Sequence, residues 1–215
     1  MTSASLLVIA KAPAPGRVKT RLTPPCTPEE AAQIAAAALA DTLAAALSAR
    51  GAARRVLVLD GAPGDWLPGP IEVIPQRGEG LAARLAAAFV DVGGPAFLVG
   101  MDTPQVTPEL LDAGLATLES ADAALGPAPD GGYWGIGLRR PDAAVFRDVP
   151  MSAPDTGAVQ RARLAVLGLR TTTLPPLRDI DTIADAHAVA AAAPASRLAA
   201  QLRRVERRLM GVAAA

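Results

Sequence analysis

The residues best suited to bind an anion stand together in one short segment, Lys11-Ala-Pro-Ala-Pro-Gly-Arg-Val-Lys-Thr-Arg21, which follows an apolar run. Lys11 and Lys19 are the only lysines of the chain, although arginine is common elsewhere. An ammonium on a flexible stem is a compact point charge that suits phosphate, whereas a guanidinium is a planar fork. A basic loop directly after a strand is also where nucleotide-binding α/β folds hold phosphate groups.

The spacing inside this loop supports the same interpretation. Arg17, Lys19 and Arg21 are separated by two residues, so an extended backbone would present all three side chains on one side. Gly16 would allow a ligand to approach the backbone closely. We therefore interpret the loop as a cradle for a di- or triphosphate. The alternative is a charged loop that simply faces solvent.

Two acids are candidates for a metal site. Asp102 follows the apolar run 96–100, and a carboxylate at the end of such a strand can bind Mg²⁺ or Mn²⁺. Its alternative role is an Asx turn with Thr103-Pro104. Because one carboxylate rarely suffices for a metal ion, Asp181 is the predicted second ligand. Its alternative role is to cap the helix that follows.

A third candidate site is the segment Asp130–Trp134, which combines an acid, two glycines and two aromatic residues. Gly131 and Gly132 would let the main chain pass close to a ligand. Tyr133 or Trp134 could stack on a base or a sugar. The other interpretation is a tight Asp-Gly hairpin turn with buried aromatic side chains.

These residues must be positioned by a fold in which apolar runs alternate with helical patterns. The expected strands are residues 5–10, 54–59, 71–74, 96–100, 121–125, 133–138 and 170–174. The expected helices are residues 28–50, 81–90, 107–120 and 156–167, followed by two Ala-rich helices. The alternation predicts an α/β fold with a mostly parallel mixed sheet and helices on both faces.

Bulk composition narrows the functional classes. A chain of 215 residues can bury one core, so we expect a single domain over residues 1–215. A net charge of zero argues against a general nucleic-acid binder. Cys26 and His187 are the only residues of their types, which excludes an internal disulfide, a cysteine metal cluster and a His-rich metal site. We expect His187 to be a helix residue and not a catalytic base.

The ends of the chain carry two further expectations. The sequence has no uninterrupted run of about twenty apolar residues, so no membrane span is expected. The first residues lack a signal-peptide pattern, and a cytoplasmic location is therefore expected. Residues 194–210 form an amphipathic pattern in which several arginines accompany Leu198, Leu202 and Val205. This helix is expected to pack on the body of the protein or on a second copy, as a homodimer. An anionic membrane surface is less favoured because the helix has no aromatic anchor.

Five motifs occur in an order that resembles a known family: residues 10–22, 76–81, 99–104, 126–133 and 179–182. Together they resemble a bacterial family of small GT-A-fold proteins described as nucleotide-diphospho-sugar transferases, one branch of which is named for arsenosugar biosynthesis. The first loop is also similar to that of the guanylyltransferase that builds the deazaflavin cofactor precursor. The resemblance covers nearly the whole chain up to about residue 190.

The resemblance implies a nucleotide-binding N-terminal half and an acceptor-binding C-terminal half. It implies that Asp102 binds Mg²⁺ or Mn²⁺ and that residues 130–133 line the donor or acceptor pocket. The residues implied to hold the nucleotide phosphates are Lys11, Gly16, Lys19 and Arg21. The chain departs from the family at Met151, where a Trp is usual, and it has no Asp-x-Asp pair at Asp102.

Three functions fit this pattern. We expect glycosyl transfer from a nucleoside diphosphate sugar to a small-molecule acceptor, with Asp130 as the acceptor's base. The basic loop and a divalent metal bound by Asp102 would stabilise the departing diphosphate. The second is nucleotidyl transfer from a nucleoside triphosphate to a phosphorylated small molecule. The third is a catalytically inactive nucleotide-binding protein.

Overall fold

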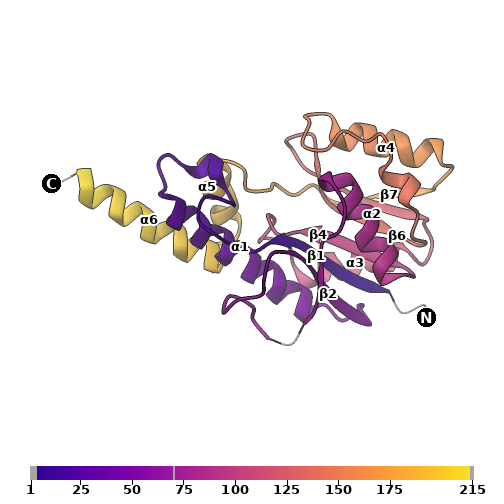
Figure 1. Cartoon of the computed structure of the whole chain (residues 1–215), viewed down its shortest axis with the longest axis horizontal. Coiled ribbons are helices and arrows are strands. Elements are labelled where there is room, and N and C mark those ends of the chain that lie inside the picture. Colours follow the sequence, from indigo (N-terminus) through magenta and orange to yellow (C-terminus); the bar gives the residue numbers. More distant parts are fainter. Residues whose placement is uncertain (1–3, 70, 214–215) are drawn as a thin grey trace.

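The strands form one mixed sheet in the computed structural model, which describes residues 4–69 and 71–213 (Figure 1). The seven strands lie in the order β3-β2-β1-β4-β6-β5-β7. Their bounds are β1 Ser5–Lys11, β2 Arg54–Asp60, β3 Glu72–Pro75, β4 Ala96–Gly100, β5 Ala123–Pro127, β6 Tyr133–Leu138 and β7 Thr171–Thr173. All neighbouring pairs run parallel except those that involve β6, which is antiparallel to β4 and β5. The expected mostly parallel mixed sheet is confirmed.

Helices cover both faces of this sheet. Helices α1 (Pro28–Ser48) and α3 (Pro108–Thr117) pack on one face, and α2 (Gly80–Val92), the short 3₁₀ helix η2 (Ala143–Phe146) and α4 (Thr156–Val166) pack on the other. Strand β1 shows why both faces are covered. Its residues Leu6 and Val8 belong to the first core, and Leu7 belongs to the second. A strand that is apolar on both sides must be buried on both sides.

Local signals fix the start of α1. The Thr27 side chain accepts a hydrogen bond from Glu30 N–H, and the Glu30 carboxylate accepts one from Thr27 N–H. This capping box satisfies two backbone donors that the first helical turn leaves free. Helix α1 is long and apolar enough to cross a membrane, but 56% of its apolar window is buried inside the structure. That burial is typical of a core helix.

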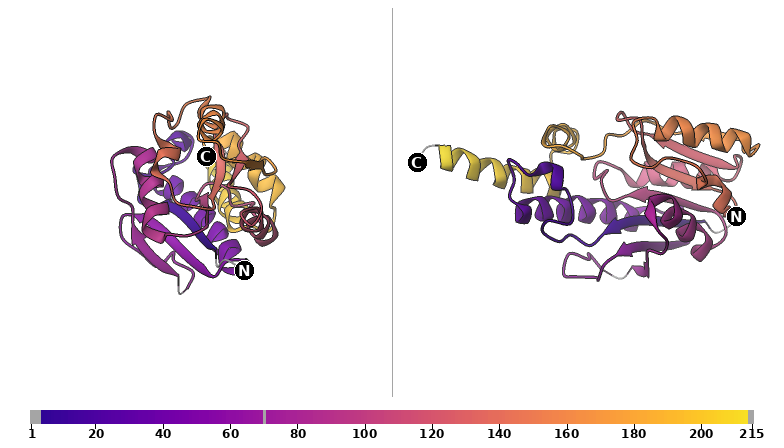
Figure 2. Two further views of the ribbon diagram at one scale, coloured as in Figure 1. Left: turned by 90° about the vertical axis from the view of Figure 1, so that its right-hand side faces the viewer. Right: turned by 45° about the horizontal axis from the view of Figure 1, so that its top comes forward.

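The last two helices extend the molecule beyond the sheet. Helices α5 (Ile183–Ala192) and α6 (Arg197–Ala213) pack against the part of α1 that projects past the strands, as Figure 2 shows. Leu198, Leu202 and Val205 of α6 are buried in this contact, so the amphipathic helix packs on its own chain. Arg208 adds a two-pronged ion pair with Glu30, at 2.6 and 2.7 Å. A homodimer stays a prediction.

The connections depart from expectation in one important place. The basic loop after β1 is a series of turns, not an extended segment, and it ends in the short 3₁₀ helix η1 (Thr20–Leu22). Lys19, just before η1, has a left-handed backbone with φ 50°. The prediction that Arg17, Lys19 and Arg21 point to one side of an extended chain is therefore wrong. The turns, and not the alternation of an extended backbone, set the directions of these side chains.

Candidate functional site

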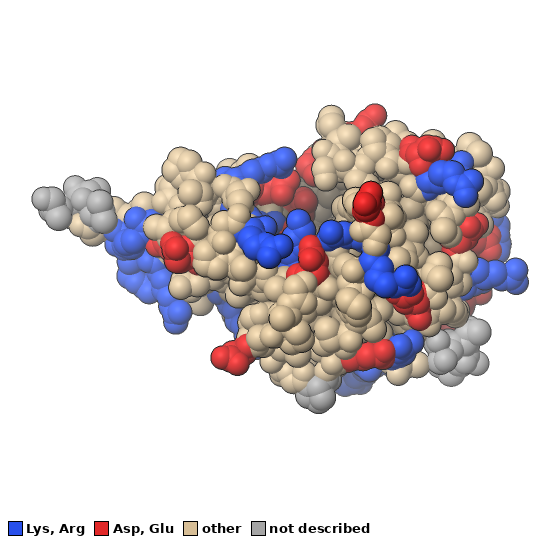
Figure 3. Space-filling view, in the orientation of Figure 1, with Lys and Arg blue, Asp and Glu red and all other residues tan. Residues whose placement is uncertain are grey.

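The candidate site is a cavity of about 880 Å³ at the carboxyl edge of the parallel strands. Ligands of open α/β sheets bind outside this edge, where the loops that follow the strands converge. The lining comes from the ends of β1 and β4, the beginning of β6, the first turn of α2, and the loop before α4. Figure 3 shows basic and acidic side chains gathered at the hollow in the middle of one face of the molecule.

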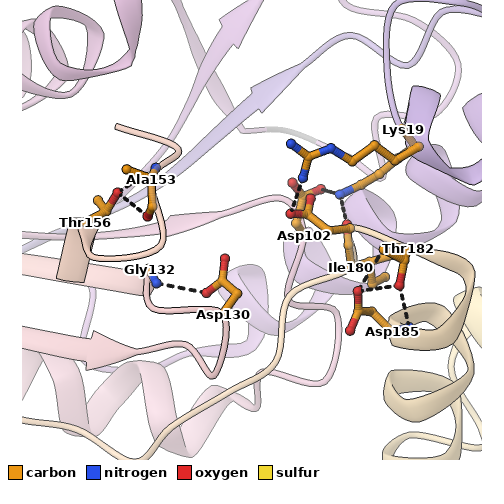
Figure 4. A network of polar contacts seen from close by, with 11 residues as sticks. Lys19, Asp102, Asp130, Gly132, Ala153, Thr156, Ile180, Thr182 and Asp185 are labelled. Atoms are coloured by element: carbon orange, nitrogen blue, oxygen red, sulfur yellow. Dashed lines mark hydrogen bonds and ion pairs between the residues drawn. The ribbon is translucent and has the colours of Figure 1, made fainter. Parts of the chain in front are cut away.

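Lys19 joins the basic loop to the rest of the site. Its ammonium lies 2.8 Å from Asp102 Oδ1 and donates a hydrogen bond to the Ile180 carbonyl (Figure 4). Only 7% of the Lys19 side chain is exposed. These contacts make this lysine a structural link between three chain segments. Lys19 also lines the cavity, and its contact with phosphate stays a prediction.

The segment that carries Asp179 and Asp181 is fastened to the turn after β4. Ile180 N–H donates to the Asp102 carbonyl at 3.0 Å, and the Gln105 side-chain amide donates to the Arg178 carbonyl. Arg21 adds an ion pair with Asp181 Oδ2 at 3.0 Å. These contacts place Asp179 and Asp181 beside the basic loop that follows β1.

Three acids form a cluster in the cavity, and two of them, Asp130 and Asp181, are predicted site residues. Asp130, Asp179 and Asp181 each place a carboxylate oxygen within 4.8 Å of the others. Burial, and next the charge of Asp130, raise the pKa of Asp179 to about 6. Hard oxygen donors at this spacing suit Mg²⁺ or Mn²⁺, which would relieve the repulsion between the carboxylates. The donor set therefore fits a divalent cation.

Asp102 stands beside this cluster rather than in it. The sequence pattern pairs Asp102 with Asp181, whereas the structure gathers Asp181 with Asp130 and Asp179 and gives Asp102 to Lys19. Asp102 Oδ1 accepts no well-directed hydrogen bond from the described residues; its contact is the ion pair. A role of Asp102 in metal binding stays a prediction. Asp179 is the acid that the sequence analysis did not select, although it stands two residues before Asp181.

The glycine pair after Asp130 serves the chain itself. A Cβ on Gly131 (φ 90°) would overlap the Pro154 carbonyl oxygen, and Gly131 O accepts a hydrogen bond of 2.7 Å from Gly157 N–H. Asp130 Oδ1 accepts from Gly132 N–H at 2.9 Å, which closes the turn between β5 and β6. At Gly131 the close approach predicted for a ligand is thus made by the loop before α4, whereas Gly132 lines the cavity and its contact with a ligand stays a prediction. The hairpin interpretation holds.

The two aromatic residues have different positions. Trp134 is 3% exposed, packs edge-on against Phe97 and donates from Nε1 to the Pro175 carbonyl at 2.9 Å. Its ring belongs to the core, although the residue also lines the cavity, and stacking of Trp134 on a ligand stays a prediction. Tyr133 is half-buried in the cavity wall, with its hydroxyl 3.4 Å from Gln160 Oε1, and burial raises its pKa.

The remaining basic residues divide between the cavity and its surroundings. Lys11 and Arg17 are exposed and line the cavity, but Gly16 does not line it. The structure adds Arg84, which also lines the cavity and pairs with Asp60 Oδ2 at 2.7 Å. Hydrogen bonding to Arg84 lowers the pKa of Asp60. Both residues stand in ordinary helix and strand-end positions, so the sequence alone carries no strong signal for them.

The geometry can now be compared with known proteins. A family model described as "Uncharacterized protein conserved in bacteria (DUF2064)" matches residues 31–153. No curated protein matches the chain. Among solved structures, a "putative nucleotide-diphospho-sugar transferase" from Desulfovibrio desulfuricans G20 is similar, with 27% identity, a TM-score of 0.85 and coverage of 96% of each chain.

More distant structures share the fold. A cytidylyltransferase from Leptospira borgpetersenii has 13% identity and a TM-score of 0.59, over 98% of this chain and 96% of that one. Rv0371C from Mycobacterium tuberculosis H37Rv, in a complex with manganese, has 19% identity and a TM-score of 0.50, over 87% and 98% of the two chains. The fold is therefore that of the GT-A-like nucleotide-sugar and nucleotidyl transferases.

Proposed function

The chain belongs to the DUF2064 family, and we propose that it transfers a glycosyl group from a nucleoside diphosphate sugar to a small-molecule acceptor. One observation carries this proposal. A basic loop and an acid cluster line a single cavity at the ligand-binding edge of the sheet, and Arg21 of the loop pairs with Asp181 of the cluster. The full-length similarity to a nucleotide-diphospho-sugar transferase structure supports it.

The basic residues would bind the diphosphate. Lys11, Arg17 and Arg21 are the cavity cations with exposed side chains, and they lie beside the end of β1. When the bond between the sugar and the diphosphate breaks, negative charge grows on the departing oxygen. Cations held in place before the reaction stabilise that charge without reorganisation.

A divalent cation would be held by Asp179 and Asp181, with Asp130 within reach. When bound, it would supply further neutralisation of the diphosphate. We assign Mg²⁺ or Mn²⁺ to this site because its donors are carboxylate oxygens.

Asp130 is the group proposed to take the proton from the acceptor hydroxyl. It is exposed at the cavity, and the hydrogen bond from Gly132 N–H fixes the orientation of its carboxylate. A positioned carboxylate of this kind can act as a general base. Asp130 lies in the half of the chain that the resemblance associates with the acceptor.

The proposal is tested by thermal shifts with UDP-, GDP- and TDP-sugars against nucleoside triphosphates, each with and without Mn²⁺. A ligand that binds only the folded state raises the melting temperature. We expect a nucleoside diphosphate sugar with Mn²⁺ to give the largest shift. Stabilisation by a triphosphate alone, with pyrophosphate released in the presence of a phosphorylated acceptor, would contradict glycosyl transfer. No shift with any nucleotide would support the inactive-protein alternative.

Two matched variants separate the roles of the acids. Asp130→Asn should leave the Mn²⁺-dependent shift largely intact and slow product formation about a hundredfold or more. Asp179→Asn should remove the Mn²⁺-dependent part of the shift. If both variants lose Mn²⁺ binding equally, Asp130 is a metal ligand and the assignment of Asp130 as a base is wrong.

A further inference from the structure

The charges that line the cavity are divided between the two halves of the chain. The basic residues of the lining all come from the N-terminal half: Lys11, Arg17, Lys19, Arg21 and Arg84. From residue 126 onward, the charged residues of the described lining are all acids: Asp130, Asp179 and Asp181. The two groups meet in the middle, where Arg21 pairs with Asp181, and Lys19 pairs with Asp102, an acid of the N-terminal half. Lys11 and Arg17, near Asp60 at the ends of β1 and β2, form the positive end of the cavity, and Asp130, just before β6, lies at the negative end.

A divalent cation bound to the acid cluster would not make the acidic end of the cavity positive. Even with Arg21, which pairs with Asp181, three carboxylates and one divalent ion carry no net positive charge. The nearest arginine on this segment, Arg178, is paired with Asp185 at 2.8 Å and does not line the cavity. A phosphate group placed beside Asp130 would meet carboxylates, and the protein cations near them, Lys19 and Arg21, are already paired with acids.

Three backbone donors around the start of α4, those of Ala153, Thr156 and Gly157, are also occupied. The loop before α4 could bind an anion only if its N–H groups were free, because helix N-termini attract anions. Thr156 N–H donates to the Ala153 carbonyl at 3.1 Å, and Gly157 N–H donates to Gly131 O at 2.7 Å. Ala153 N–H donates to Thr156 Oγ1 at 3.0 Å. These amide groups stabilise the loop and are not available to a phosphate.

The rest of the wall in this half is apolar or neutral. Met151 lines the cavity beside Tyr133, and the Tyr133 hydroxyl lies 3.8 Å from Met151 Sδ. An aromatic ring and a thioether form a surface that suits the apolar part of a small molecule. A neutral or cationic ligand would gain from this surface and would not be repelled by Asp130.

We propose that the acceptor is an uncharged or cationic hydroxyl compound whose apolar part packs on Tyr133 and Met151, and not a phosphorylated molecule. This inference rests on the proposed function and names its substrate class. In the transfer, the acceptor oxygen forms a bond to the anomeric carbon, while the bond from that carbon to the diphosphate breaks. The bonding electrons leave with the diphosphate, and the hydroxyl proton passes to Asp130.

The test compares 2-phenylethanol with its phosphate monoester as binding probes. Each is titrated into the protein that is saturated with Mn²⁺ and with the nucleoside diphosphate giving the largest thermal shift, which blocks the basic half. We expect the alcohol to bind at least about tenfold more tightly than the ester. Tighter binding of the ester, or no binding of the alcohol, would overturn the proposal.

A charge introduced into the wall provides a second test. Met151→Arg should improve the affinity of the ester about tenfold and weaken that of the alcohol. Met210→Arg is the matched control, because Met210 is an exposed residue of α6 outside the cavity lining, and both affinities should be unchanged. If Met151→Arg leaves both affinities unchanged, the proposal fails. Failure of every nucleoside diphosphate to bind would contradict the proposed function itself, a result distinct from preference for the ester.

Discussion

Lys19 and Asp102, which follow the first and fourth strands, form an ion pair of 2.8 Å in the wall of the cavity. The same ammonium binds the Ile180 carbonyl between the two acids of the last segment. One lysine therefore holds together the basic loop, the turn after β4 and the acid cluster. Its contribution to stability and its contribution to ligand binding are physically coupled.

Removal of this lysine should destabilise the protein. Lys19→Ala leaves the Asp102 carboxylate beside the cavity without its cation, and we expect the free energy of unfolding to fall by about 1–3 kcal/mol. Urea denaturation measures this change. In a double-mutant cycle with Asp102→Ala, the two effects should be strongly non-additive. A loss below about 0.5 kcal/mol would show that the ion pair is not a structural link.

This coupling changes which variant is suitable for a binding test. Lys19→Ala would alter the site even without ligand. Arg17 is exposed, lines the cavity and forms no ion pair with the described residues. Arg17→Ala is therefore the variant that reports on phosphate binding without an effect on stability.

Ionisation of Asp179 should lower the free energy of unfolding of the metal-free protein at neutral pH. Its folded-state pKa of about 6 lies above its ordinary value of 3.8, because burial and the Asp130 charge oppose ionisation. The ionised form is therefore less favourable in the folded state than in the unfolded state. Asp179→Asn should raise the free energy of unfolding of the metal-free protein by about 1–3 kcal/mol at pH 7.5.

The pH dependence provides the control for this prediction. As the pH falls from 6 toward 4, the folded-state carboxyl becomes protonated and its penalty disappears, so the gain from Asp179→Asn should shrink. Thermal melts of both proteins in EDTA across this range measure the difference. Asp185→Asn should instead lower the free energy of unfolding at pH 7.5. Hydrogen bonds with Thr182 and Arg178 stabilise the ionised form of Asp185 and lower its pKa. A stabilised Asp185→Asn or a destabilised Asp179→Asn at pH 7.5 would contradict these assignments.

Gly131 should be intolerant of any side chain. Gly131→Ala combines an unfavourable φ of 90° with a direct overlap with the Pro154 carbonyl. We expect a loss of about 3 kcal/mol or more. Gly168→Ala is the matched control, since φ is 70° but nothing lies within 4 Å of the added Cβ, and it should cost about 1–2 kcal/mol. Equal losses in the two variants would mean that the contact with the loop before α4 does not constrain Gly131.

Much of the fold could be predicted because its signals are local. The predicted strand 96–100 matches β4 at both ends, and the predicted helix 28–50 begins at the same residue as α1. Other strand ends are less well predicted: β5, an inner strand, begins two residues later than expected, at Ala123. Tertiary pairing with β6 and β7, and not local composition, decides where that strand begins.

The site was harder to predict because its contacts span long sequence distances. The conformation of the basic loop depends on Lys19 reaching Asp102 and Ile180. The role of Gly131 depends on a loop more than twenty residues later. Asp179 joins Asp130 only after the last segment folds over the turn after β4. Residue types identified the chemistry, but only the fold shows which residues meet.

The most direct test of the central claim is a calorimetric titration of wild-type protein and Arg17→Ala with a nucleoside diphosphate sugar in the presence of Mn²⁺. The sugar nucleotide with the largest thermal shift is the ligand. Loss of a charge-assisted contact to the diphosphate should weaken binding about tenfold to a hundredfold. The melting temperature of the free protein should be unchanged. Equal affinity for the two proteins, or no binding of any nucleoside diphosphate sugar to the wild type, would contradict the account.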